Sequence, residues 1–64
     1  MMRLRDAKKL HNRDNVIFKK TKEVGYVLGE PVVMRASETR KEWVNIPAQF
    51  PCLGFVWVAH DEVE

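Results

Sequence analysis

Short apolar runs separated by turn-forming residues follow one another along most of this chain. Runs that are rich in β-branched and aromatic residues, and bounded by Gly, Pro, Asn or Asp, are typical of β-strands. We predict extended segments over residues 15–20, 23–28, 32–35, 41–46 and 55–58. A single helical turn at residues 60–62 and a last short strand at Val63 complete the predicted elements.

Proline and small polar residues place the breaks between these segments. Gly29-Glu30-Pro31 should bend or interrupt the second strand, because proline has no N–H to donate to a ladder. Residues 37–40 have the composition of a turn, and Pro47 is expected to end the strand that begins at Lys41. Residues 48–54 then form an irregular connection to the next strand.

The two-residue period of a strand sorts the aromatic residues onto one face. If Val44 and Ile46 fill the core, and Val56 and Val58 do so from the next strand, then Trp43, Phe55 and Trp57 point outward. Two other readings stay open: the phase is reversed, with Phe55 and Trp57 inside, or the N-terminal residues fold over the patch. Tyr26 is a further candidate surface aromatic, although it could equally pack against Phe18.

The first eleven residues are predicted to form a flexible basic segment, and residues 12–64 a single domain. A helix over residues 2–10 competes with this interpretation, because Leu4, Ala7 and Leu10 fall three apart. Five short strands in about 50 residues bury a core only by closing on themselves or by packing sheet on sheet. We therefore expect an all-β small barrel of mostly antiparallel strands.

Four short motifs, spread over residues 13–64, resemble those of the SH3-like small barrels. They are Asp14-x-Val16-x-Phe18, the polar loop Lys19–Lys22, Gly25-Tyr26-Val27 and the closing turn Asp61-Glu62-Val63. The Tudor/KOW-type and photosystem-I subunit-E-like electron-transport accessory barrels are the most similar branches. The glycine that commonly precedes the first aspartate is Arg13 here. The resemblance implies a barrel fold and a binding or docking role without catalysis.

Charge is distributed unevenly along the chain. Residues 1–22 carry eight Lys or Arg against two Asp, a net charge of +6, whereas residues 23–64 carry three against seven carboxylates, a net charge of −4. The basic part could meet an anionic partner or could be an ordinary solvated surface. The longest apolar stretch, residues 52–59, is far shorter than the roughly 20 residues that span a bilayer. With no visible secretion signal and a single cysteine, we expect a cytoplasmic protein, and its size is compatible with a phage or mobile-element origin.

No constellation of residues in the sequence predicts catalysis. Cys52 with His60 or His11 is the only nucleophile and base combination, and its apolar neighbours predict a buried or structural cysteine. One cysteine and two histidines do not supply a zinc site, and the adjacent Asp61 and Glu62 do not face each other across a cleft. We predict that the protein is not an enzyme and has no cofactor or metal.

The sequence favours a small accessory or regulatory module that docks on a larger protein or assembly. The predicted aromatic anchor consists of Tyr26, Trp43, Phe55 and Trp57. The predicted electrostatic contacts are Arg3, Arg5, Lys8, Lys9, Lys19, Lys20 and Lys22. The alternative is an RNA- or DNA-binding barrel in which bases stack on the tryptophans and these cations contact phosphates. Self-association through an open strand edge or the apolar patch is a third possibility, so we expect a monomer or a weak homo-oligomer.

Overall fold

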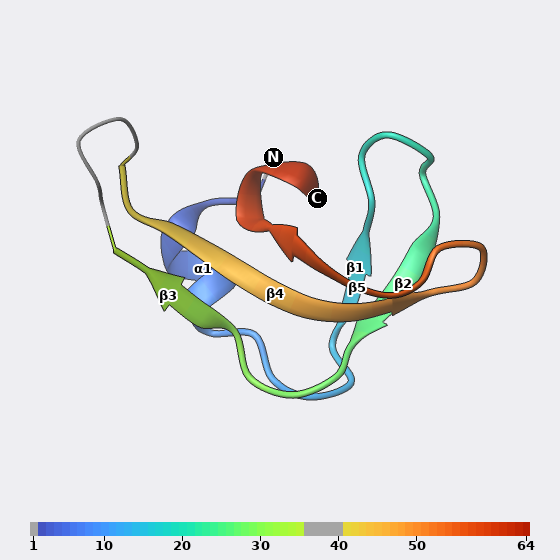
Figure 1. The fold of residues 1–64 in the computed structure, drawn as a ribbon, viewed down its shortest axis with the longest axis horizontal. Coiled ribbons are helices and arrows are strands. Elements are labelled where there is room, and N and C mark those ends of the chain that lie inside the picture. Colours follow the sequence, from blue (N-terminus) through green and yellow to red (C-terminus); the bar gives the residue numbers. More distant parts are fainter. Residues whose placement is uncertain (1, 36–40) are drawn as a thin grey trace.

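The computed structural model describes residues 2–35 and 41–64, so the turn predicted at residues 37–40 lies outside the described residues. The chain there is mostly β, with one short α-helix and one 3-10 turn (Figure 1). The elements in chain order are α1 (Leu4–Lys8), β1 (Asn15–Ile17), β2 (Val24–Val27), β3 (Val32–Met34), β4 (Trp43–Phe50), β5 (Gly54–Ala59) and η1 (His60–Glu62).

The strands form one antiparallel sheet around the long strand β4. The hairpin β1–β2 pairs through β2 with Ala48 and Gln49, and β3 pairs with β4 farther along the same edge. Strand β5 pairs along the opposite edge of β4, from Phe50 to Asn45. Residues 28–31 separate β2 from β3. The predicted interruption at Gly29-Glu30-Pro31 is therefore confirmed.

Pro47 does not end β4, contrary to the prediction from sequence. The strand continues to Phe50, and Pro47 pairs with Trp57 of β5. Leu28 N–H donates to the Pro47 carbonyl (2.9 Å). Along one edge of an antiparallel strand, residues alternate between positions that exchange both backbone bonds with the neighbour and positions that exchange none. The bond from Leu28 shows that the backbone polar groups of Pro47 point towards the β2 edge, and Pro47 has no N–H to donate back. The missing N–H therefore faces the edge on which β2 ends, and it leaves the ladder with β5 unaffected.

One face of the sheet forms the hydrophobic core. Val44, Ile46, Ala48 and Phe50 alternate along β4 and are fully buried, and Val58 on β5 is nearly so. They pack with Ala7, Val16, Val27 and Val63, while Val56 is partly buried against the same cluster. Of the two phases that the sequence left open for β4 and β5, the structure has the one with the valines and isoleucine inside.

The N-terminal residues differ from the flexible segment that we predicted for residues 1–11. Leu4–Lys8 form α1, and Ala7 is fully buried in the core. Met2 N–H donates to the Val63 carbonyl (3.0 Å), and Met2, Leu4 and Leu10 pack against the core cluster. The competing interpretation of a helix over residues 2–10 is therefore correct for Leu4 and Ala7, whereas Leu10 follows the end of the helix.

The C-terminal residues return to the hairpin β1–β2. The predicted helical turn at residues 60–62 is the 3-10 turn η1, in which Glu62 Oε1 accepts a hydrogen bond from Ala59 N–H (2.8 Å). Val63 then forms an isolated antiparallel bridge with Phe18, and Glu64 N–H donates to the Ile17 carbonyl (2.9 Å). The end of the chain therefore lies beside β1, and Val63 enters the core cluster close to the segment that leads into α1.

Candidate functional site

The side of the sheet that faces away from the core carries two cross-strand rows of side chains. Tyr26 and Phe55 lie opposite Gln49 on its two sides, because both pair with it in register. In the second row, two residues earlier in β4, Trp57 lies opposite Pro47. The Pro47 carbonyl accepts the hydrogen bond from Leu28 N–H on its other side. Directly opposite side chains on one face of a sheet are in contact distance.

This side, which we call the outer face, exposes large apolar groups. Phe55 is 51%, Trp57 49% and Tyr26 43% exposed, and the Phe55 and Trp57 rings meet edge to face with centroids 6.2 Å apart. The exposed apolar members of the outer face are Val24, Tyr26, Leu28, Val32, Phe55 and Trp57. Contiguous apolar surface of this kind commonly marks an interaction site.

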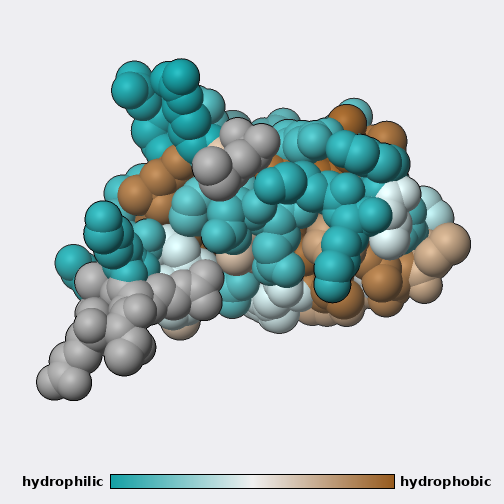
Figure 2. Space-filling model, turned by 90° about the horizontal axis from the view of Figure 1, so that it is seen from above, coloured by the Kyte–Doolittle hydropathy of each residue, from teal (hydrophilic) through white to brown (hydrophobic). Residues whose placement is uncertain are grey.

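The five strands contain no Asp, Glu, Lys or Arg between the bounds that the structure gives them. Every charge of the described chain lies in a loop, in α1, in η1 or at an end. Figure 2 shows a different side of the molecule, where hydrophilic residues dominate and hydrophobic ones gather at the end that carries the β4–β5 turn. The strands of the outer face therefore carry no charged residue, and their polar side chains there are the amides Asn15, Asn45 and Gln49.

Trp43 lies apart from the other predicted anchor residues. It pairs with Met34 of β3 at the start of β4 and is half-buried. Pro47 lies four positions farther along β4. At the rise of a strand, this places Trp43 about 13 Å from Pro47. The structure therefore brings Tyr26, Phe55 and Trp57 together and leaves Trp43 at the other end of the sheet.

Sequence reasoning missed the aliphatic members of the outer face: Val24, Leu28 and Val32. Val24 and Leu28 lie two residues on either side of Tyr26, so the same two-residue period that sorted β4 and β5 could have found them. Val32 pairs with Asn45, which requires the register between β3 and β4. That register could not be read from one strand alone.

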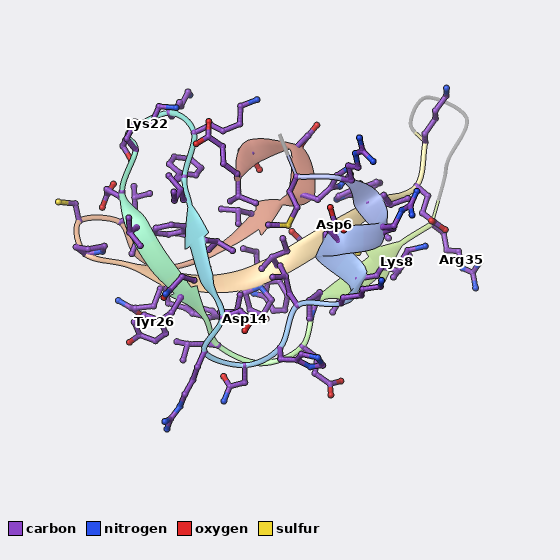
Figure 3. All side chains as sticks on the ribbon, turned by 180° about the vertical axis from the view of Figure 1, so that it is seen from behind. Asp6, Lys8, Asp14, Lys22, Tyr26 and Arg35 are labelled. Atoms are coloured by element: carbon purple, nitrogen blue, oxygen red, sulfur yellow. The ribbon has the colours of Figure 1, made fainter. Side chains whose placement is uncertain are left out.

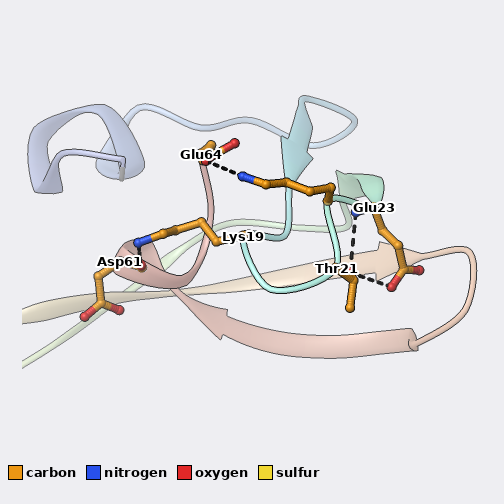
Figure 4. A network of polar contacts seen from close by, with 6 residues as sticks. Lys19, Thr21, Glu23, Asp61 and Glu64 are labelled. Carbon is orange, nitrogen blue, oxygen red and sulfur yellow. Dashed lines mark hydrogen bonds and ion pairs between the residues drawn. The ribbon is translucent and has the colours of Figure 1, made fainter.

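The predicted basic loop is tied to the C-terminus rather than to the outer face (Figure 4). Lys22 Nζ forms an ion pair with Glu64 (3.0 Å), and Lys19 Nζ donates to the Asp61 carbonyl (3.4 Å). Lys20 is exposed and lines a shallow pocket of about 200 Å³ with Phe18, Lys19, Asp61 and Glu62. Because this pocket joins two lysines to two carboxylates, it offers no single sign of charge to a ligand.

The N-terminal cations lie on the core side of the sheet, since α1 packs against β4 through Ala7. Lys8 Nζ forms an ion pair with Glu42 (3.0 Å). Within the described residues, the side chains of Arg3, Arg5 and Lys9 have no ion-pair partner. Figure 3 shows Lys8 on α1 and Tyr26 at opposite ends of the molecule. The structure thus does not join these cations to the aromatic cluster.

Glu23 connects the β1–β2 loop to the β4–β5 turn. Its Oε1 accepts a hydrogen bond from Cys52 N–H (2.8 Å), and its Oε2 accepts one from the Thr21 hydroxyl (2.8 Å). The bond from the Cys52 backbone, followed by the bond from Thr21, lowers the pKa of Glu23 below the ordinary 4.5. The ionised carboxylate therefore holds the two loops together.

The candidate chemical groups are separate from one another. Cys52 is an exposed free thiol in the β4–β5 turn, so the expectation of a buried cysteine is wrong: the turn projects its apolar neighbours away from the core. His60 lies at the other end of β5, about 20 Å away at the rise of a strand. Its Nδ1 accepts a hydrogen bond from Val44 N–H (3.2 Å), which gives it a structural role.

Across residues 2–35 and 41–64, no group of three or more His, Cys, Asp or Glu is arranged to hold a metal ion. No helix in that part of the chain has the length and apolar character needed to cross a membrane.

Comparisons with protein-family models, with curated proteins and with solved structures found no match to this chain. The inference of function therefore depends on the geometry described above.

Proposed function

We propose that this chain is a small SH3-like barrel that acts as a non-catalytic accessory module and docks on a larger protein through its outer face. The order of elements supports the fold: a polar loop between β1 and β2, a 3-10 turn after β5, and then Val63 bridged to Phe18. These are the features on which the sequence resembles that family.

The observation that carries the docking role is the exposure of Tyr26, Phe55 and Trp57 on one uncharged face. Tyrosine and tryptophan are enriched among the residues that contribute most to binding energy. They contribute it when a partner removes them from water. Aromatic side chains that only filled a core would be buried, as Phe50 is. Cations outside the outer face, such as Lys20, Arg3 and Arg5, would steer an acidic partner during approach.

The arrangement supports protein docking better than nucleic-acid binding. A single strand that stacked its bases on Trp57 would need cations along the same face to neutralise its phosphates. The outer face has none within the described strands, and the N-terminal cations lie on the side of α1.

The test is a comparison of partner capture by matched variants. Immobilised wild-type protein, the double variant Phe55→Thr/Trp57→Thr and the control Leu53→Thr are exposed to one lysate, and captured proteins are quantified. Leu53 is exposed to a similar degree but lies in the β4–β5 turn. We expect the double variant to lose at least nine-tenths of the specific capture that the control retains.

Equal capture by all three proteins would refute docking through the outer face. A parallel titration with mixed single-stranded oligonucleotides at two salt concentrations distinguishes the alternative. Binding that weakens steeply with salt and shifts the Trp57 indole signal would replace the docking proposal by a nucleic-acid one.

A further inference from the structure

We infer that the outer face also binds a second copy of this chain, so that the protein forms a twofold symmetric dimer by packing one outer face on another. This inference rests on the same exposed surface as the proposed docking role. When no larger partner is present, a second copy of the chain occupies that surface.

The first argument is the area available. An aromatic side chain presents 150–250 Å² when fully exposed, so the half-exposed Tyr26, Phe55 and Trp57 together offer about 300 Å². With the exposed Val24, Leu28 and Val32, the outer face offers roughly 500 Å² in each copy, or about 1,000 Å² for a pair, which is the lower limit for a specific interface. The expected dimer is therefore weak.

The second argument is the absence of charge from the described strands. A twofold axis sets a surface against its own copy, so residues close to the axis meet identical residues. Any lysine or carboxylate there would meet a like charge. The outer face avoids this repulsion, because its strands carry no charged residue between the described bounds, although the whole chain has a net charge of +2.

The third argument is the position of Gln49. It lies between Tyr26 and Phe55 in the middle of one cross-strand row and is half-buried. Its amide has both donors and an acceptor, so it can pair with the same amide of a second copy. A carboxylate at this position would instead face another carboxylate across the axis.

The test is sedimentation equilibrium of the purified protein from about 1 µM to 1 mM, the range suited to a weak interface of this size. A reductant is present, because the exposed Cys52 could otherwise crosslink two copies. We expect the average mass to rise from 7.5 kDa towards twice that value as the concentration increases. A mass that stays at 7.5 kDa up to the highest concentration would overturn the inference.

Two variants test whether the dimer uses this face. Gln49→Glu adds a charge with little change in size, and Phe55→Thr/Trp57→Thr removes two rings; circular dichroism confirms that each is folded. We expect both to raise the dissociation constant of the dimer at least tenfold, whereas Leu53→Thr leaves it within twofold of the wild-type value. If both folded variants associate as the wild type does, the inference is wrong.

Nuclear magnetic resonance of the wild type gives a second readout that needs no substitution. Dilution should shift the indole signal of Trp57 and the amide signals of Tyr26 and Gln49. Concentration-dependent association that leaves all three unchanged would place the contact elsewhere and refute the inference.

The outcomes for the two proposals are separable, because this experiment contains no other protein. A strictly monomeric wild type that still captures a partner through Phe55 and Trp57 refutes the dimer and leaves docking intact. A dimer broken by Gln49→Glu, in a protein whose capture is insensitive to the aromatic variants, refutes docking and supports the dimer.

Discussion

Gly25 is the residue that most tightly restricts this fold. A Cβ at this position would lie 2.4 Å from the Gln49 carbonyl oxygen and 2.5 Å from the Phe50 ring. Gly25 pairs with Val16 in the middle of β2, and Phe50, itself 5.6 Å from Phe18 between ring centroids, fills the space that a side chain would take. The glycine is therefore required by close packing of strands.

Gly25→Ala should lower the free energy of unfolding by about 2–3 kcal/mol, because the added methyl group meets backbone and a fully buried ring. Urea denaturation measures the change. Gly54→Ala is the control, since its Cβ would meet nothing within 4 Å although its φ of 75° is left-handed. A loss at Gly25 no larger than the loss at Gly54 would contradict this account.

Arg13 occupies a backbone conformation that suits glycine. Its φ is 76°, and its N–H donates to the Val27 carbonyl (2.7 Å), so the conformation is fixed by the fold. The left-handed region costs an L-residue about 1–2 kcal/mol.

Arg13→Gly should raise the free energy of unfolding by about 0.5–1 kcal/mol. Relief of the backbone strain stabilises the folded state, and the greater conformational entropy of glycine in the unfolded chain offsets part of that gain. Arg13→Ala removes the same side chain but keeps the strain, so it should give no gain. Thermal denaturation compares the three proteins, and equal stability of the Gly and Ala variants would show that the backbone is not strained.

At the scale of elements, the sequence predicted what depends on local pattern. The period of two correctly grouped Val44, Ile46 and Val58 on one face and Phe55 and Trp57 on the other, but it left open which face is buried. The turn at residues 60–62 needed only its neighbours. Local chemistry was sufficient for these features because each strand has one buried side.

What could not be predicted depends on pairing between distant strands. Pro47 remains inside β4 because its missing N–H faces the point at which β2 ends. The separation of Trp43 from Trp57 follows from the register of β4 and β5, which sets Trp57 opposite Pro47 and not beside the start of β4. The helix α1 is too short to be stable alone, and it forms where Ala7 can enter the core.

At the scale of the whole molecule, two carboxylates connect parts that are distant in sequence. Glu23 binds the β4–β5 turn, and Glu64 binds Lys22 in the β1–β2 loop. The hydrogen bond and charge of Lys22 lower the pKa of Glu64 below 4.5, as the Cys52 backbone bond does for Glu23. Both groups therefore stabilise the folded state in their ionised form.

Acid should weaken the fold through these two groups. A carboxyl whose pKa is lowered by folding contributes stability that is present above its unfolded pKa of 4.5 and is lost as the pH falls through the folded value. The melting temperature should therefore fall as the pH is lowered through 4.5 and below it. Glu23→Gln, which keeps an oxygen for Cys52 N–H but does not titrate, should show a smaller fall, and an unchanged slope would show that Glu23 is not involved.

The hydrogen bond between Met2 and Val63 has a consequence for how this unit can be joined to other chains. It brings the two ends of the described fold side by side, as Figure 1 shows. A unit whose entry and exit points are adjacent can be inserted into a surface loop of another domain without separating the ends of that loop. Linking residues 2 and 63 and opening the chain at the β4–β5 turn would likewise give a circular permutant with every strand pairing retained.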